Sequence, residues 1–160
     1  RRAQMKVAKI DGAYNRRFIR EVYEKNDGKA KEAIMNYLIK NGHEILDSQE
    51  NFSFDIKSKK GDNIYFSEAE MKNQWKGNWP ETWKEIRIPY RKHKLINRMA
   101  ELGADNHFFN FYVIRTDAKM AWRIKDFVVA ESEVKKLFSY RVKGESFFHI
   151  PYQKAELVEL

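Results

Sequence analysis

The apolar residues in the early part of the chain recur at the spacing of a helix. A short helix is predicted over residues 15–25, and the sequence Asn26-Asp27-Gly28 is predicted to form a turn after it. A clearer helix is predicted over residues 29–41, and Gly42 follows it as a stop signal. Its apolar stripe consists of Ala30, Ala33, Ile34, Tyr37 and Leu38.

The hydrophobic period changes from helical spacing to strict alternation after this point. A short strand is predicted at residues 43–46 and a second at residues 51–57, where Phe54 and Ile56 face one way and Asp55 faces the other. The sequence from Lys59 to Asn63 predicts a hairpin turn, and residues 63–73 predict a longer third strand.

The remainder of the chain predicts one more helix and further strands. Residues 74–84 are typical of a loop, and a helix is predicted from Pro89 to Gly103. The next predicted elements are a strand at 107–115, an antiparallel partner at 121–129, a short helix at 132–138 and a hairpin over 140–150 that turns at 143–145.

Taken in order, these elements predict a helix, three strands, a helix and a strand, followed by extra β structure. Such an order is typical of an α/β (α+β) domain in which helices flank a central mixed sheet. The chain of 160 residues is long enough for one domain and one hydrophobic core. We therefore expect residues 1–160 to form a single domain.

Composition narrows the range of functions. The formal net charge of +8 favours a polyanionic partner such as nucleic acid. The absence of cysteine excludes disulfides, thiol catalysis and zinc–thiolate sites, and it fits a reducing cytoplasm, or a host cytoplasm for a viral protein. No stretch of sequence is long and apolar enough to predict a membrane span.

The third predicted strand, NIYFSEAEMKN, carries the candidate chemistry. One of its faces begins with apolar residues and then becomes charged, with Glu68, Glu70 and Lys72 in succession. The other face stays small or apolar through Met71. A solvated face would be polar throughout, so this pattern indicates a buried strand whose end opens into a polar cleft.

Carboxylates beside an ammonium group have a specific chemical use. Carboxylate oxygens bind Mg²⁺ or Mn²⁺, the cation polarises a phosphodiester, and a lysine can orient the attacking water. Asp55 lies on the preceding predicted strand and is expected to approach Glu70. A second Glu-x-Lys sequence, at Glu133 and Lys135, is interpreted as the solvated surface of a helix.

In this arrangement the chain resembles the PD-(D/E)XK nuclease superfamily. Its shared core is a helix, three strands, a helix and a strand, with an aspartate on the second strand and Glu-x-Lys on the third. Asp55, Glu70 and Lys72 match that pattern over residues 28–115, although Phe54 stands where the family name has proline. The resemblance implies a restriction-endonuclease-like fold and a metal-dependent DNA nuclease.

The resemblance also implies roles for individual residues. Asp55 and Glu70 would bind Mg²⁺ or Mn²⁺ together with the main-chain carbonyl of Met71, and Lys72 would serve the attacking water. Glu32, in the first predicted helix, is similar to the helix glutamate of archaeal Holliday-junction resolvases, which would make it a further catalytic residue and metal ligand. Glu68 shares the face of Glu70 and is either an additional ligand or a neighbour that tunes the site.

Three segments are candidates for contact with DNA. Basic residues at the start of the second predicted helix and near the hairpin turn can contact phosphates: Arg91, Lys92, Lys94, Arg98, Lys57, Lys59 and Lys60. The loop that holds Trp75, Trp79 and Trp83 could stack on unpaired bases, but we expect at least one of these tryptophans to lie in the core or in a dimer contact.

The leading hypothesis is a structure-directed, resolvase-like DNA endonuclease of the kind found in phages and archaea, and a homodimer would suit paired cuts on symmetric DNA. A compact restriction or homing endonuclease is the alternative within the same class. A nucleic-acid-binding module without catalysis and a basic structural protein are the alternatives outside it. Metal-dependent cleavage and salt-dependent DNA affinity distinguish these hypotheses.

Overall fold

The fold is built around a six-stranded mixed sheet, seen in a computed structural model that describes residues 20–49, 54–138 and 143–160. The strand order is β1-β2-β3-β5-β6-β9, and only the central β3–β5 pair is parallel among these neighbours. The strands are β1 (Glu44–Asp47), β2 (Ile56–Lys60), β3 (Asn63–Lys72), β5 (His107–Arg115), β6 (Met120–Lys125) and β9 (Glu156–Glu159).

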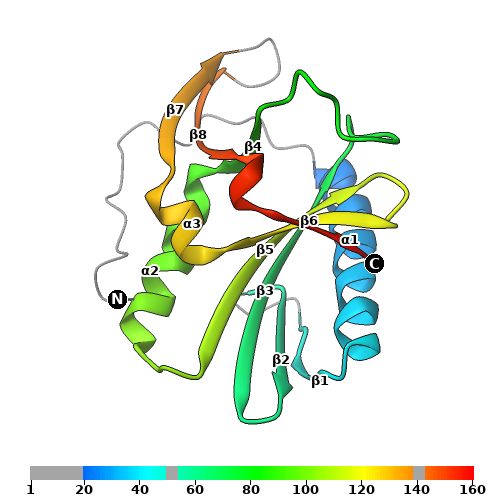
Figure 1. The fold of residues 1–160 in the computed structure, drawn as a ribbon, viewed down its shortest axis with the longest axis vertical. Coiled ribbons are helices and arrows are strands. Elements are labelled where there is room, and N and C mark those ends of the chain that lie inside the picture. Colours follow the sequence, from blue (N-terminus) through cyan, green and yellow to red (C-terminus); the bar gives the residue numbers. More distant parts are fainter. Residues whose placement is uncertain (1–19, 50–53, 139–142) are drawn as a thin grey trace.

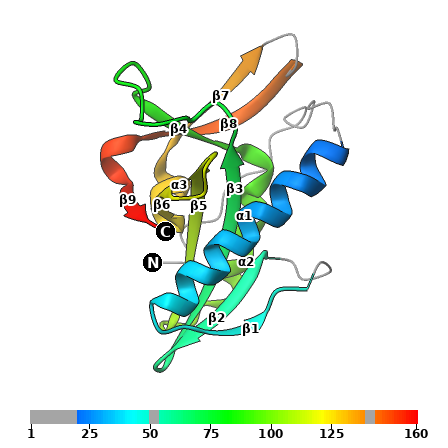
Figure 2. The same ribbon diagram turned by 90° about the vertical axis from the view of Figure 1, so that its right-hand side faces the viewer.

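Helices cover both faces of this sheet. The long helix α1 (Arg20–Lys40) crosses one face, whereas α2 (His93–Leu102) and α3 (Asp126–Glu131) lie on the other (Figures 1 and 2). The structure therefore confirms the predicted mixed α/β architecture. No helix in the described ranges is long and apolar enough to cross a membrane.

A second, three-stranded antiparallel sheet lies on the same side as α2 and α3. It has the order β4-β8-β7, with β4 at Glu85–Pro89, β7 at Glu133–Phe138 and β8 at Lys143–Pro151. The short turns η2 (Tyr90–Lys92) and η3 (Tyr152–Lys154) each follow one of its strands. Figure 1 shows β7 and β8 extending beyond the edge of the main sheet.

Alternation along the strands produces two separate hydrophobic cores. Ala69 of β3 packs with Ile34 of α1 in the smaller core, whereas Phe66 of β3 belongs to the larger core, which includes Ile96 of α2. Since successive side chains of a strand point to opposite faces, β3 contributes to both cores. The face with Phe66 is the one that continues into Glu68 and Glu70.

Several predicted elements have their expected bounds. The third strand and the strand at residues 107–115 are confirmed as β3 and β5, and the first short strand is confirmed as β1. The turn between β2 and β3 is also confirmed, with Gly61 at a φ of +60° that a side chain would disfavour. The predicted strand at 51–57 and the predicted hairpin at 140–150 each lie partly outside the described residues.

The predicted break at Asn26-Asp27-Gly28 is wrong, because α1 runs through these residues without interruption. A glycine inside a helix costs only about 1 kcal/mol relative to alanine. Packing of the following turns through Ala30, Ile34 and Leu38 offsets such a cost. The start of the predicted helix at 15–25 lies outside the described residues.

A strand was missed between the tryptophan-rich loop and the second helix. The sequence Glu85-Ile86-Arg87-Ile88 forms β4, with Ile86 and Ile88 buried and Arg87 exposed. This alternation is a strand signal, but it spans too few residues to stand out before Pro89. The helix that follows begins at His93, after the turn η2, rather than at Pro89.

The predicted antiparallel partner of β5 at residues 121–129 is confirmed as β6, but the predictions for residues 126–138 are wrong in type. The strand β6 ends at Lys125, and the helix α3 begins at Asp126, whose Oδ1 accepts a hydrogen bond from the N–H of Phe127 at 2.9 Å. Residues 133–138 form the strand β7 instead of a helix, and β8 is a single strand with no turn at 143–145. Glu133 and Lys135 therefore share a strand face, where both are largely exposed and form a 3.4 Å ion pair.

The packing of α1 against the sheet gives a test of this architecture. We expect Ile34→Ala to lower the free energy of unfolding by about 2–4 kcal/mol, because Ile34 is fully buried between α1 and the sheet. Ile39→Ala, on the same helix but with 54% of the residue exposed, should change it by less than about 1 kcal/mol. Urea unfolding followed by circular dichroism measures both, and equal losses would contradict the observed orientation of α1.

Candidate functional site

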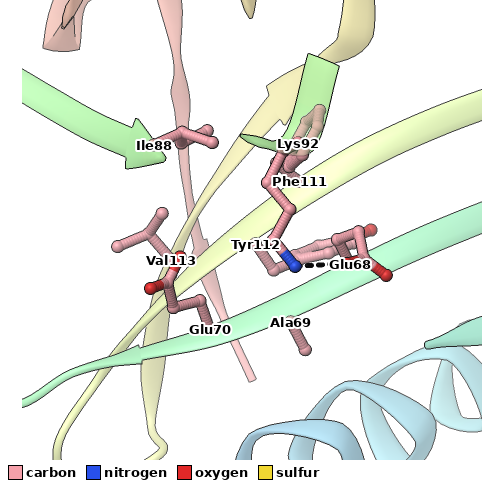
Figure 3. A pocket seen from close by; sticks show the side chains of 8 residues that line it. All are labelled: Glu68, Ala69, Glu70, Ile88, Lys92, Phe111, Tyr112 and Val113. Carbon is pink, nitrogen blue, oxygen red and sulfur yellow. Dashed lines mark hydrogen bonds and ion pairs between the residues drawn. The ribbon is translucent and has the colours of Figure 1, made fainter. Parts of the chain in front are cut away.

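The charged end of β3 opens into a pocket between the two sheets. Glu68 and Glu70 project from the same side of β3 into this pocket, while Ala69 points to the opposite side, toward α1 (Figure 3). Lys92 also lines the pocket, and most of the remaining lining is apolar, with Ile88 from β4 and Phe111 and Val113 from β5. Glu68 is 6% exposed, so most of its carboxylate is removed from water.

Asp55 joins this group from the start of β2. Ile56 pairs with Ser67, so Asp55 lies directly opposite Glu68 rather than Glu70. Each carboxylate accepts a hydrogen bond from a backbone N–H of the other segment. Glu68 Oε2 accepts from the N–H of Asp55 at 2.7 Å, and Asp55 Oδ2 accepts from the N–H of Ala69 at 2.8 Å. Asp55 thereby continues the β2–β3 ladder with its side chain.

Lys92 supplies the positive charge that faces these carboxylates. Its Nζ donates to Glu68 Oε1 at 2.7 Å, and the two side chains are 23% and 7% exposed, respectively (Figure 3). Lys92 also interacts electrostatically with Glu70 and Asp55. The ammonium group is therefore bonded to Glu68 and is near enough to Glu70 and Asp55 for their charges to act on it.

The turn η2, which carries Lys92, is held in place by its neighbours. Tyr90 is buried and its ring lies 4.8 Å from that of His93, whose Nδ1 is 2.9 Å from the Tyr90 carbonyl oxygen. Arg91 donates to Glu145 of β8 at 2.8 Å, and Glu145 is 1% exposed. These contacts fix the backbone on both sides of Lys92, so its side chain approaches the carboxylates from a rigid base.

Burial and charge shift the proton affinities of this pair. Burial raises the pKa of Glu68 to about 7, and the charge of Asp55 adds to the increase, while Lys92 and the N–H of Asp55 oppose it. The carboxylates around Lys92 raise its pKa even though burial acts to lower it. Lys92 consequently stays protonated at neutral pH and stabilises the ionised form of Glu68.

Lys72 lies farther along β3 in a different environment. Its Nζ is 5.1 Å from the centre of the Trp83 ring. Burial and the positive charge of Arg87 lower the pKa of Lys72, and Glu70 partly opposes that change. The site therefore has one lysine that is held in its charged form and another that releases its proton more readily.

The backbone of Met71 faces the same edge of β3 as Asp55. Backbone groups of alternate strand residues point to the same edge, and the N–H of Ala69 points to Asp55 rather than to β5. The carbonyl group of Met71 therefore also points to that edge, while its side chain packs against the core beneath α1.

The structure does not bring Glu32 to this cluster. Glu32 is exposed on α1, while Ala30 and Ile34, two positions away on either side, face the sheet. Residues two positions from the buried stripe point away from it. Moreover, α1 covers the face of the sheet opposite to Glu68 and Glu70. The role expected for Glu32 from the resemblance has no geometric support.

The predicted DNA-contacting residues divide into groups with different surroundings. Arg91 and Lys92 are engaged by buried carboxylates, whereas Lys94 and Arg98 are exposed on α2. Lys57, Lys59 and Lys60 lie on β2, where pairing with Phe66 and Ile64 places Lys57 and Lys59 on the face of the sheet that bears Glu68. The predicted basic helix start is thus not one continuous surface.

The tryptophans after β3 pack mainly against each other. Trp75 is 1% exposed and belongs to the larger core, which confirms the expectation that at least one of them is a core residue. Trp79 contacts the rings of Trp75, Trp83 and Trp122, with ring centres 5.0–5.6 Å apart. This aromatic cluster stiffens the loop that ends β3 near Lys72.

The donor set fits a weakly held divalent cation. Among the described residues, no three acidic or histidine side chains stand close enough to hold a metal ion as they are arranged. However, Mg²⁺ commonly binds through one or two carboxylates and completes its coordination with waters and substrate phosphates. Within the described parts of the chain, no hydrogen bond reaches Asp55 Oδ1 or the Glu70 carboxylate, so these oxygens match such a site.

Sequence reasoning missed the contribution of Lys92 to the pocket. It is one of several basic residues between Arg91 and Arg98, and nothing in that segment distinguishes it from Lys94. Its position depends on β4, which was not predicted, and on the buried pair of Arg91 with Glu145. Glu68, in contrast, was already marked by its place between apolar residues and Glu70 on one strand face.

Comparison with protein-family models, curated proteins and solved structures finds no match to this chain. The geometry of the site and the sequence resemblance are therefore the grounds on which a function can be proposed.

The ion pair between Glu68 and Lys92 can be tested by a double-mutant cycle. Lys92→Met should lower the free energy of unfolding by about 2–3 kcal/mol, because it leaves a buried carboxylate without its partner. Glu68→Met in the same protein should restore most of this loss, since the buried carboxyl group that lost its partner is then absent as well. Urea unfolding at neutral pH measures the cycle. Lys76→Met, which alters an exposed lysine, is the control, and additive losses in the double variant would argue against the pair.

Proposed function

We propose that this protein is a metal-dependent DNA endonuclease that hydrolyses phosphodiester bonds. A structure-directed, resolvase-like enzyme is the form that we favour. The observation that carries the proposal is that Glu68 and Glu70 line one pocket, that Asp55 is hydrogen-bonded to Glu68 and Ala69 beside it, and that Lys72 and Lys92 both interact electrostatically with Glu70. The sequence resemblance to PD-(D/E)XK nucleases, which involves the same Asp55, Glu70 and Lys72, agrees with this proposal.

In this proposal, Asp55 and Glu70 bind Mg²⁺ or Mn²⁺, and the carbonyl group of Met71 faces the same edge of β3. The cation, when bound, polarises the phosphodiester and makes a nearby water more acidic. Two carboxylates are enough for such a cation when a phosphate oxygen and waters complete its coordination. Glu32 takes no part, because it lies across the sheet from these residues.

The two lysines have different proposed tasks. A Lys72 amine with a lowered pKa can accept a proton at Nζ from the attacking water, or orient that water by a hydrogen bond. Lys92 remains charged and adds positive potential to the pocket, which favours the negative charge that develops on the phosphate. The apolar walls formed by Ile88, Phe111 and Val113 exclude bulk water and strengthen these interactions.

DNA is the proposed substrate because of the basic surface around the pocket. Lys57 and Lys59 extend from Asp55 along β2 on the face that bears the site, and Lys94 and Arg98 are exposed on α2. Such side chains contact phosphates irrespective of sequence. The net charge of +8 acts in the same direction by steering the polyanion to the protein.

Cleavage assays test the proposed activity. The protein should cut supercoiled plasmid or a four-way DNA junction with Mg²⁺ or Mn²⁺, and should not cut with EDTA. Asp55→Asn and Glu70→Gln should each lower the rate by at least about a hundredfold, because each removes a charged ligand that stabilises the transition state. Glu44→Gln, an exposed change on β1, is the matched control and should keep the wild-type rate.

Each alternative function has its own signature in these assays. Salt-sensitive DNA binding without metal-dependent cleavage would favour a non-catalytic binding module. Cutting at one short sequence would favour a restriction or homing endonuclease over a resolvase. Cleavage that survives both carboxylate substitutions would contradict the proposed site.

The proposed phosphate contacts predict a change in salt dependence. Lys57→Gln should weaken DNA binding for all sequences alike and should reduce the slope of log affinity against log salt by about one. Binding measured by fluorescence anisotropy from 50 to 200 mM salt with Ca²⁺ in place of Mg²⁺ gives this slope. Lys119→Gln, an exposed lysine next to the β5–β6 turn, provides the control. Equal slopes in all three proteins would exclude Lys57 as a phosphate contact.

A further inference from the structure

The three carboxylates of the pocket are not equivalent. Both oxygens of Glu68 are engaged, one by Lys92 Nζ and the other by the N–H of Asp55, each at 2.7 Å. Asp55 has one oxygen engaged by the N–H of Ala69. For Glu70, no hydrogen bond to the carboxylate is found in the described part of the chain. Glu68 is therefore the carboxylate least able to accept a cation.

The position of Lys92 is fixed by the structure around it. The backbone of η2 is held by the buried ring of Tyr90 and by the contact of Arg91 with Glu145 of β8. Lys92 itself lies largely within the protein and faces three carboxylates. A rotation out of the pocket would leave Glu68 buried without compensation, which is costly.

We propose that Lys92 is a positioning residue that withholds Glu68 from the divalent cation, so that the cation meets the two carboxylates of Asp55 and Glu70. This inference rests on the proposed function, since it concerns the same cation site. It also resolves the two roles considered for Glu68, because Glu68 then holds the lysine and does not coordinate the metal.

The arrangement has a direct consequence for cation affinity. An ammonium group a few ångströms away repels a divalent cation, and the paired Glu68 contributes no ligand. Two carboxylates leave coordination positions for a phosphate oxygen and waters, whereas a third would fill one of them. Lys92 thus keeps the affinity of the site for the cation alone low, and it leaves coordination positions for the substrate phosphate.

Substitution of Lys92 should therefore strengthen cation binding. In Lys92→Met, the repulsion is lost and Glu68 becomes available as a third carboxylate, so Mn²⁺ should bind at least about tenfold more tightly than to the wild type. Lys92→Arg keeps the charge and should bind Mn²⁺ like the wild type. The double variant Glu68→Met/Lys92→Met should lose most of the gain, because the released ligand is absent.

The experiment is a titration with Mn²⁺ alone, without DNA, in which free Mn²⁺ is measured by electron paramagnetic resonance. Lys76→Met is the matched control, since it removes one positive charge from an exposed position. If Lys92→Met does not fold without a cation, the Mn²⁺ concentration that restores its circular dichroism spectrum replaces the titration midpoint. A Lys92→Met protein that stays unfolded at every Mn²⁺ concentration would contradict the proposal, because the cation then cannot replace the ammonium.

The outcomes separate this inference from the proposed function. If the wild type binds Mn²⁺, Asp55→Asn and Glu70→Gln abolish binding, and Lys92→Met binds no more tightly, the cation site stands and only the role of Lys92 is wrong. A gain in Lys92→Met that persists in the double variant would likewise overturn the withholding of Glu68. If no variant binds Mn²⁺, the cation site of the proposed function fails, and the inference fails with it.

Discussion

A carboxylate buried inside a sheet requires compensation, and Glu68 obtains it from two sources. The ammonium group of Lys92 donates a hydrogen bond to one oxygen, and the N–H of Asp55 donates one to the other. An unpaired charge at this depth would cost several kcal/mol, so both partners have to be in place in the folded protein. The arrangement of β2, β3 and the turn η2 around the pocket meets this requirement.

The topology explains how these partners meet. The strands β3 and β5 are parallel neighbours, so the chain between them has to cross over one face of the sheet. That crossover contains β4, η2 and α2, and it delivers Lys92 to the face that carries Glu68 and Glu70. The helix α1 covers the opposite face, which separates Glu32 from the site. The same pairing that builds the sheet therefore decides which charged residues share the pocket.

Sequence patterns predicted the parts of this site that depend on local structure. The alternation along residues 63–72 placed Glu68 and Glu70 on one face, and the short turn at Gly61 made Asp55 a cross-strand neighbour. The exact register was not predictable, so Asp55 was expected beside Glu70 rather than Glu68. Lys92 depends on contacts between distant segments, such as Arg91 with Glu145, and a single sequence does not reveal them. The helix and strand types beyond Lys125 were wrong because short segments there follow their tertiary pairing rather than their local propensity.

The most direct test of this account is the position of a bound cation. Crystals of the protein soaked in Mn²⁺ would reveal the ion through its anomalous scattering. We expect the Mn²⁺ ion to lie between Asp55 and Glu70, with Lys92 Nζ still bonded to Glu68. An ion coordinated by Glu68 with Lys92 displaced, or an ion bound only at a site remote from β3, would contradict it.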